Sequence, residues 1–145
     1  MRKFEKVSYN DRGIIPTRAD DASAGYDFYS PIDFEIKPNE FVHIETNIKA
    51  SMEQDEVLLL FVRSSIGIKR HLALANGTGV IDSSYYNNEG NEGNIICALY
   101  NYGNETQCIK QGERIMQGVF VKYLTVENDI VTGSQRKGGI GSSGK

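Results

Sequence analysis

The sequence has few residues that bind metals or form cross-links: two cysteines and two histidines in 145 residues. Cys97 and Cys108 lie eleven positions apart and form no CxxC pair, so we expect no zinc site. Buried, reduced thiols are the default expectation for two such cysteines. A chain of this length suits one domain, whose core can bury roughly two-thirds of the unfolded surface.

Long apolar segments are also missing. No run approaches the ~20 residues that cross a membrane, and the first ten residues, MRKFEKVSYN, lack the apolar core of a secretion signal. The net charge is −3 and the pI about 5.4, which argues against binding nucleic acid through bulk basic charge. We therefore expect a cytoplasmic protein that binds neither membranes nor nucleic acid.

No window shows a convincing helical period of 3.6 residues, and the dominant period is two. In residues 41–50, Val42, Ile44, Thr46 and Ile48 alternate with polar residues, as in one half-buried strand. Further apolar, β-rich strands are predicted at 56–62, 94–100 and 118–124. The nearest approach to a helix is a turn or two within 65–75.

These short strands and the turn signals between them predict an all-β fold, a jelly-roll-like barrel or sandwich. We expect one domain over residues 1–131, followed by a flexible glycine-rich arm over 132–145. No internal repeat interrupts the domain.

The segment VRSSIG (62–67) follows a buried strand directly. Arg63 with the hydroxyls of Ser64 and Ser65 suits an anion, because a guanidinium binds phosphate oxygens through two parallel hydrogen bonds. An equally good interpretation is that Ser64 or Ser65 caps a helical turn.

The segment NGTGVIDSSY (76–85) combines several features of a binding hairpin. Asn76 and the glycine after it favour a tight turn, and Gly79 lets the backbone approach a ligand closely. Asp82 places a carboxylate just beyond two apolar residues, and Tyr85 could stack on a flat ring or a sugar. An ordinary hairpin with a surface aspartate is the alternative.

Three further segments carry polar groups in apolar or glycine-rich surroundings. Asp27 lies between aromatics in SAGYDFYS, and Arg114 and Gln117 flank an Ile-Met pair in GERIMQG. The last ten residues, RKGGIGSSGK, are rich in glycine, and successive N–H groups in such segments can wrap oxyanions. They contain no Walker A pattern. The alternative for Asp27 is a strand-edge carboxylate, and the alternative for Arg114 and Gln117 is an ordinary strand. The alternative for the last ten residues is a disordered end or an engineered linker.

Read in order, these five segments resemble the five motifs of the homotrimeric dUTP pyrophosphatases (dUTPases). The resemblance runs from about Pro16 to the end of the chain, and GVIDSSY with RKGGIGSSG is its most specific part. It implies a β-clip, jelly-roll-like barrel that hydrolyses dUTP to dUMP and pyrophosphate with Mg²⁺. It also implies a homotrimer with active sites between subunits, where each C-terminal arm closes over a neighbour's site.

The resemblance implies a role for each matched residue. Asp82 would activate the attacking water, Asp27 would hold Mg²⁺ through water, and Arg114 would be largely structural. The nucleoside would contact Asn76, Gly79, Val80, Ile81, Tyr85, Ile96 and Ile140. The phosphates would contact Arg63, Ser64, Ser65, Gln117, Arg136, Gly141, Ser142 and Ser143.

The chain departs from the family pattern at two places. Ile140 stands where the family usually has a phenylalanine over the uracil ring, so we expect a looser lid and weaker apparent affinity. Residues 86–94, YNNEGNEGN, form a longer and more acidic insert than usual. A floppy surface loop is the simpler interpretation of this insert, and a contact site for a regulatory protein is the sharper one.

Three alternatives to a dUTPase stay open on sequence alone. A dCTP deaminase-type homologue shares the fold, an RSS-type motif and the trimer. A dUTPase-like protein could instead act as a nucleotide-switched regulator that binds another protein. A structural β-sandwich without an active site would leave the coincidence of five motifs unexplained.

Overall fold

The computed structural model describes residues 1–133 of the chain. These residues form eleven strands and two short helical turns, and the strands pair only in antiparallel fashion. The elements are β1 (Lys3–Lys6), β2 (Tyr26–Tyr29), β3 (Phe34–Ile36), β4 (Phe41–Glu45), β5 (Ile48–Ser51), β6 (Glu56–Phe61), η1 (Ser65–Lys69), β7 (Leu72–Leu74), β8 (Gly79–Asp82), η2 (Ser83–Tyr85), β9 (Ile96–Asn101), β10 (Gln107–Ile109) and β11 (Arg114–Lys122).

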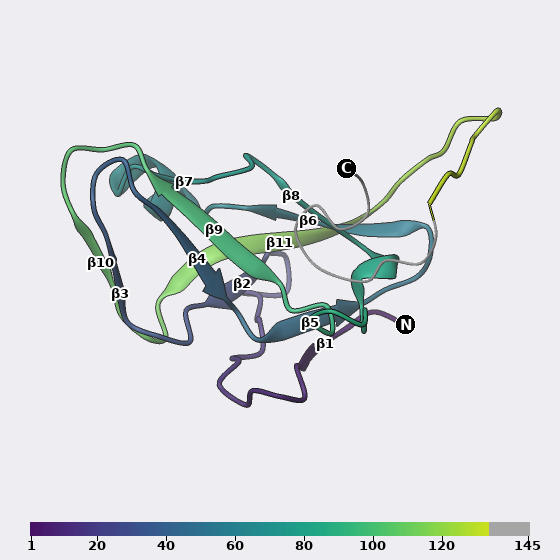
Figure 1. The fold of residues 1–145 in the computed structure, drawn as a ribbon, viewed down its shortest axis with the longest axis horizontal. Helices are drawn as coiled ribbons and strands as arrows, with labels where there is room; N and C mark the ends of the chain where they lie inside the picture. The colour runs from purple at the N-terminus through teal and green to yellow at the C-terminus, as the bar shows by residue number, and fades with distance from the viewer. Residues whose placement is uncertain (134–145) are drawn as a thin grey trace.

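Two larger sheets and two strand pairs make up the body of the fold. One sheet has the order β2-β11-β6-β8 and the other β4-β9-β7, while β1 pairs with β5 and β10 with β3. In Figure 1, β4 and β9 cross in front of β11 and β6, as two sheets of a jelly-roll-like barrel do. The predicted all-β fold is therefore confirmed.

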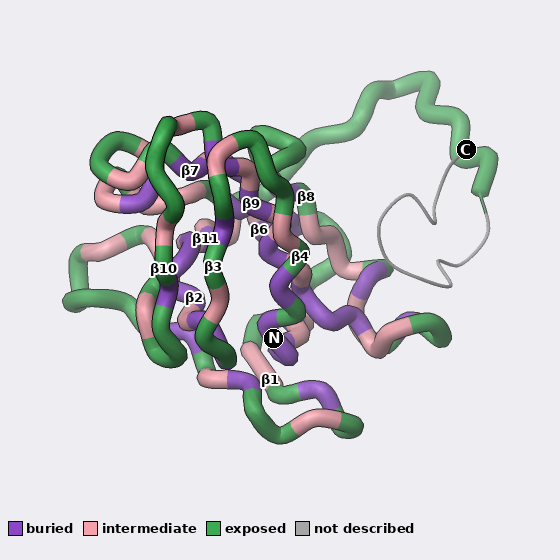
Figure 2. The backbone as a smooth tube through the Cα atoms, turned by 60° about the vertical axis from the view of Figure 1, so that its left-hand side comes forward, coloured by how far each residue is buried: buried purple, intermediate pink, exposed green. Residues whose placement is uncertain are grey.

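The core lies between these sheets, as the buried backbone in Figure 2 shows. Period-two burial accounts for most of it: along β9, residues alternate between half-buried and fully buried. β6 is apolar and mostly buried at its centre, and it is an inner strand of its sheet, hydrogen-bonded to β11 on one side and to β8 on the other. The largest fully buried apolar side chains are Phe28, Ile36, Ile48, Leu58, Leu72, Ile95, Leu99, Ile109, Ile115 and Met116.

Residues 41–50, which the sequence predicted as one strand, form two strands in different sheets. β4 ends at Glu45 and β5 begins at Ile48, and Asn47 between them has φ of +61°. Ile44, Thr46 and Ile48 are buried as predicted, but Asn47 is buried as well. The left-handed backbone at Asn47, which asparagine tolerates better than most residues, turns the chain from one sheet to the next.

The predicted helical turn is present as η1, a single π-type turn, and the rest of the 65–75 window continues into β7. Of the two cysteines, Cys97 is fully buried, and burial raises the pKa of its thiol to about 12. Cys108 is exposed on β10 because its side chain takes the outward position of a half-buried strand. The expectation that both thiols are buried is wrong for Cys108.

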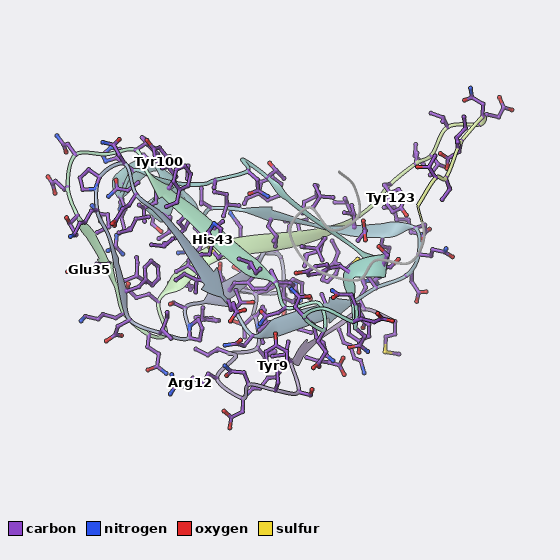
Figure 3. All side chains as sticks on the ribbon, viewed as in Figure 1. Tyr9, Arg12, Glu35, His43, Tyr100 and Tyr123 are labelled. Carbon is purple, nitrogen blue, oxygen red and sulfur yellow. The ribbon has the colours of Figure 1, made fainter. Side chains whose placement is uncertain are left out.

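The strands end at Lys122, and residues 123–133 leave the body of the fold as an exposed segment. Tyr123 marks the start of this segment in Figure 3. Among the residues that the structure describes, no helix is long and apolar enough to cross a membrane.

Candidate functional site

A cavity of about 460 Å³ opens beside β8, and its wall also includes residues of β4, β6, β7, β9 and β11. All six described residues that were predicted to hold a nucleoside line it: Asn76, Gly79, Val80, Ile81, Tyr85 and Ile96. The seventh, Ile140, lies outside the described residues.

The turn before β8 shapes the mouth of this cavity. Gly77 has φ of +76° and its N–H donates to Leu74 O at 2.9 Å. The predicted tight hairpin is wrong, because β7 pairs with β9 and β8 pairs with β6 in the other sheet. Gly79 then pairs with Leu60 on β6, and a Cβ at Gly79 would lie 2.9 Å from Leu60 Cβ. Glycine at position 79 is therefore required by the packing of β8 on β6, whatever a ligand demands.

The cavity is mostly apolar, with polar groups at a few points. Asn76 and Thr78 come from the turn, and His43 contributes an imidazole from β4. A cavity with an apolar wall and few polar groups suits a flat ring that carries hydrogen-bonding groups on one edge. Sequence reasoning missed His43, because it occupies an outward position of a half-buried strand and no motif surrounds it.

Tyr85 is buried, and its hydroxyl is held on both sides. It donates a hydrogen bond of 2.6 Å to Asn94 O and accepts one of 2.9 Å from Asn91 Nδ2. These partners belong to the 86–94 insert, so the insert packs against the cavity wall.

The insert is not the floppy surface loop that its composition suggested. Asn88 and Asn94 are buried, and Lys49 Nζ lies 2.8 Å from the carboxylate of Glu92. The carboxylate of Glu92 accepts hydrogen bonds from Lys49 on β5 and from Ser8 in the N-terminal segment. Only Asn87, Glu89 and Gly90 of the segment are exposed.

Asp82 ends β8, directly after the cavity residues. Ser84 Oγ donates a hydrogen bond of 2.6 Å to Asp82 Oδ1. This local contact orients the carboxylate at the point where the chain turns into η2.

A second group of predicted residues gathers where β6 ends, around the nearly buried carboxylate of Asp27. Arg63 Nε lies 3.0 Å from Asp27 Oδ1, and Arg114 lies 3.7 Å from Asp27 Oδ2. Arg63 also donates a hydrogen bond of 3.2 Å to Ser65 Oγ. Gln117 stands opposite Asp27 in the pairing of β11 with β2. We call these five residues the charged cluster.

The glycine at position 25 makes room for one member of the charged cluster. A Cβ on Gly25 would lie 2.4 Å from Gln117 Oε1, so the glycine lets this glutamine keep its observed rotamer. Ser64 is exposed and makes no side-chain capping hydrogen bond with η1. The helix-capping interpretation is therefore not supported for Ser64, and its hydroxyl faces solvent beside Arg63.

Asp82 and the charged cluster lie at opposite ends of β6, whereas the cavity extends along the strand as far as Leu60, three residues before Arg63. Asp82 pairs with Val57, whereas Arg63 follows the other end of β6, six residues further along. At ~3.3 Å per residue, the strand from Val57 to its end at Phe61 accounts for about 13 Å of this separation. The described part of one chain brings the residues predicted to hold a nucleoside together in one cavity and Arg63 to Asp27, but it does not bring Asp82 to Arg63.

Within residues 1–133 no group of three or more histidine, cysteine or acidic side chains could hold a metal ion. Asp27 offers one carboxylate, and its Oδ2 is too far from Arg114 for a close hydrogen bond. One carboxylate with spare acceptor capacity fits Mg²⁺ that takes its other ligands from phosphates and water. The predicted phosphate residues Arg136, Gly141, Ser142 and Ser143 lie outside the described residues.

Comparison with known proteins gives one consistent result. The model of the family described as dUTPase matches residues 11–144. The deoxyuridine 5'-triphosphate nucleotidohydrolase of Lactococcus lactis is 42% identical over 147 residues, with 99% of this chain and 98% of the relative covered. That of Haemophilus influenzae is 36% identical and covers 90% of this chain and 87% of its own length.

Solved structures agree with the sequence matches. The dUTPase from Streptococcus mutans superposes with a TM-score of 0.81 at 39% identity, covering 87% of this chain and 99% of that one. The dUTPase of Staphylococcus bacteriophage 80alpha gives a TM-score of 0.75 at 25% identity, over 90% and 96% of the two chains.

Proposed function

The chain belongs to the dUTPase family and hydrolyses dUTP to dUMP and pyrophosphate, and from this premise we propose that each active site is shared between copies of the chain. One copy supplies the cavity and Asp82, and another supplies the charged cluster. The observation that carries the proposal is that Asp82 and Arg63 lie at opposite ends of β6, with about 13 Å of strand from Val57 to Phe61 between them. Hydrolysis at the α-phosphorus needs both groups on one substrate molecule.

The exposed C-terminal segment supports an assembly of several copies. Leu124, Ile130 and Val131 are 96%, 81% and 83% exposed, respectively. Large apolar side chains gathered in one segment usually mark an interaction surface. We propose a homotrimer, in which these residues are covered by a neighbouring copy.

In the proposed mechanism, the cavity binds uracil and Tyr85 packs on the deoxyribose. Arg63, Ser64, Ser65 and Gln117 bind the phosphate oxygens through charged and neutral donors. A water molecule attacks the α-phosphorus, Asp82 accepts its proton, and pyrophosphate leaves. The carboxylate acts by positioning the water and by base catalysis. Base catalysis alone raises the rate on the order of 10²–10⁴-fold.

Mg²⁺ would bind the triphosphate oxygens and, through water, Asp27. When bound, the metal neutralises part of the negative charge that the attacking water meets. Asp27 also keeps the side chains of Arg63 and Arg114 at the site through its two oxygens.

We further propose that residues 132–145 form an arm that closes over a neighbour's site. Arg136, Gly141, Ser142 and Ser143 would bind the terminal phosphates, and Ile140 would cover the base with an aliphatic rather than an aromatic side chain. Because Ile140 offers no π stacking, Ile140→Phe should lower the Michaelis constant (KM) for dUTP. An unchanged KM would remove Ile140 from the site.

The insert offers little surface for the regulatory alternative. Its exposed part is limited to Asn87, Glu89 and Gly90, and most of its polar side chains contact this same chain. We therefore propose catalysis, rather than regulation through residues 86–94, as the main function.

The test combines product analysis with a mass measurement. Wild type, Asp82→Asn and a chain ending at Gly133 are assayed with Mg²⁺ for pyrophosphate release from dUTP, dCTP, dTTP and UTP. We expect selective dUTP turnover by the wild type alone, and a solution mass of three times 16.2 kDa. Full turnover by a monomer would contradict the shared site, and ammonia release from dCTP would indicate a deaminase.

A further inference from the structure

The insert 86–94 holds the cavity tyrosine through residues that do not themselves line the cavity. The ring of Tyr85 lines the cavity, while its hydroxyl reaches Asn94 O and Asn91 Nδ2 at 2.6 and 2.9 Å. A tyrosine ring has two side-chain torsions, and a partner on the hydroxyl fixes the far end of the ring. The position of the ring in the cavity therefore depends on where the insert holds these partners.

Asn91 is the central connection inside the insert. Its Oδ1 accepts hydrogen bonds from Asn88 Nδ2 at 2.8 Å and from Gly93 N at 3.1 Å, which leaves Nδ2 to donate to Tyr85. Asn88 Nδ2 also donates to Tyr85 O at 2.8 Å. Both ends of Tyr85, the backbone carbonyl and the phenol, are thus tied to the same small network of asparagines.

Gly93 allows this network to lie directly on the backbone of the tyrosine. It has φ of +89°, and a Cβ there would lie 2.8 Å from Tyr85 O. No other residue type fits at position 93 without moving the insert away from Tyr85.

The outer side of the insert is anchored to strands far from the cavity. Glu92 accepts from Lys49 on β5 at 2.8 Å and from the N–H of Ser8 at 2.9 Å. Tyr9, which lies below β1 and β5 in Figure 3, donates its hydroxyl to Asn91 O at 3.3 Å. The insert therefore bridges the β1–β5 pair and the cavity wall, and Asn91 touches both sides of the bridge.

We infer that Asn91 is a positioning residue for substrate selection: it sets the distance between the Tyr85 ring and the sugar, and so excludes a 2′-hydroxyl. This inference rests on the proposed packing of Tyr85 against deoxyribose. A ring held close to C2′ rejects UTP by contact, and a ring released from its partners leaves space for the hydroxyl. Small displacements of positioning groups have large kinetic effects.

The test compares Asn91→Ala with wild type for both dUTP and UTP. Loss of one hydrogen bond to the Tyr85 hydroxyl is expected to raise KM for dUTP about two- to tenfold. The preference for dUTP over UTP in kcat/KM falls by a similar factor, while kcat for dUTP changes by less than about twofold. Matched controls are Asn104→Ala, in the exposed turn between β9 and β10, and Glu89→Ala, at the exposed tip of the insert.

A double-mutant cycle shows whether Asn91 acts through the hydroxyl of Tyr85. Asn91→Ala should change KM and sugar preference much less in a Tyr85→Phe background than in wild type, because the shared hydrogen bond is already gone and only the contacts of Asn91 Oδ1 with Asn88 and Gly93 are still lost. If Asn91→Ala alone fails to fold, Tyr85→Phe breaks the same bond from the ring side and should by itself lower the preference for dUTP.

The outcomes distinguish an error about the role of Asn91 from an error about the packing of Tyr85 on the sugar. If Tyr85→Phe lowers the preference for dUTP but Asn91→Ala behaves like Asn104→Ala, the positioning role of Asn91 is wrong. Additive effects of the two substitutions would also overturn it. If neither substitution changes the preference while dUTP turnover continues, the packing of Tyr85 on the sugar is itself wrong.

Discussion

The buried side chain of Asn94 offers the sharpest test of how the fold supports the site. Its Oδ1 accepts from Asn47 N at 2.9 Å, and its Nδ2 donates to Asn47 Oδ1 and to Tyr9 Oη, both at 3.0 Å. These contacts stabilise the left-handed backbone at Asn47, where the chain passes from β4 to β5. The perturbation is Asn94→Ala, which removes all three hydrogen bonds and leaves the buried N–H of Asn47 without this acceptor.

The magnitude follows from counting these bonds. Each contributes about 0.5–1.5 kcal/mol, and a buried donor left unsatisfied costs about 1–3 kcal/mol. For the N–H of Asn47, the lost hydrogen bond and the unsatisfied donor are one effect and are counted once. We therefore expect a loss of about 2–4 kcal/mol in the free energy of unfolding. For a chain of this size that corresponds to a fall in Tm of about 6–15 °C.

The assay is thermal unfolding of wild type, Asn94→Ala and Asn104→Ala at equal protein concentration, because assembly makes Tm depend on concentration. Asn104 is exposed and provides the matched asparagine-to-alanine change. We expect Asn104→Ala to stay within about 2 °C of wild type. A Tm for Asn94→Ala equal to that of Asn104→Ala would refute the structural role of the buried asparagine.

Two further predictions concern charged residues. Asp27→Asn should shift the Mg²⁺ activation curve for dUTP turnover to higher concentrations, because the amide binds metal-bound water more weakly; an unmoved midpoint would show that Asp27 serves only Arg63 and Arg114. The hydrogen bonds from Lys49 and Ser8 lower the pKa of Glu92 to about 2 from an ordinary 4.5, so the stability they provide is complete above that ordinary value and is lost as the pH falls toward 2. Urea unfolding at pH 2 to 6 should therefore show a weaker acid dependence for Glu92→Gln than for wild type, and identical profiles would contradict the assignment.

Contiguous patterns in the sequence predicted much of the fold and the cavity. The alternation along β9 and the apolar run in β6 depend only on neighbouring residues, so period-two reasoning found both. The cavity residues from Asn76 to Tyr85 lie in one contiguous segment, and their motif made them visible as a group. His43 escaped because its only relation to that segment is spatial.

Long-range polar contacts could not be predicted in the same way. The turn at Asn47 between β4 and β5 depends on Asn94, 47 positions away, and the anchoring of Glu92 depends on Ser8, 84 positions away. Asparagine and glycine in YNNEGNEGN are typical of mobile loops, and only the fold shows that most of the asparagine side chains in this run point inward. Composition indicates local preference, whereas burial of these amides is decided by distant partners.

The most direct test of a site shared between copies is complementation between two inactive variants. Asp82→Asn lacks the proposed base and Arg63→Ala lacks a phosphate-binding group, so each homogeneous assembly should be nearly inactive with dUTP. When the two are unfolded together and refolded as mixed assemblies, random association should restore about one quarter of wild-type activity, because some sites then combine an intact Asp82 with an intact Arg63. If the mixed assemblies are no more active than the separate variants, each chain holds a complete site of its own, and the shared site is wrong.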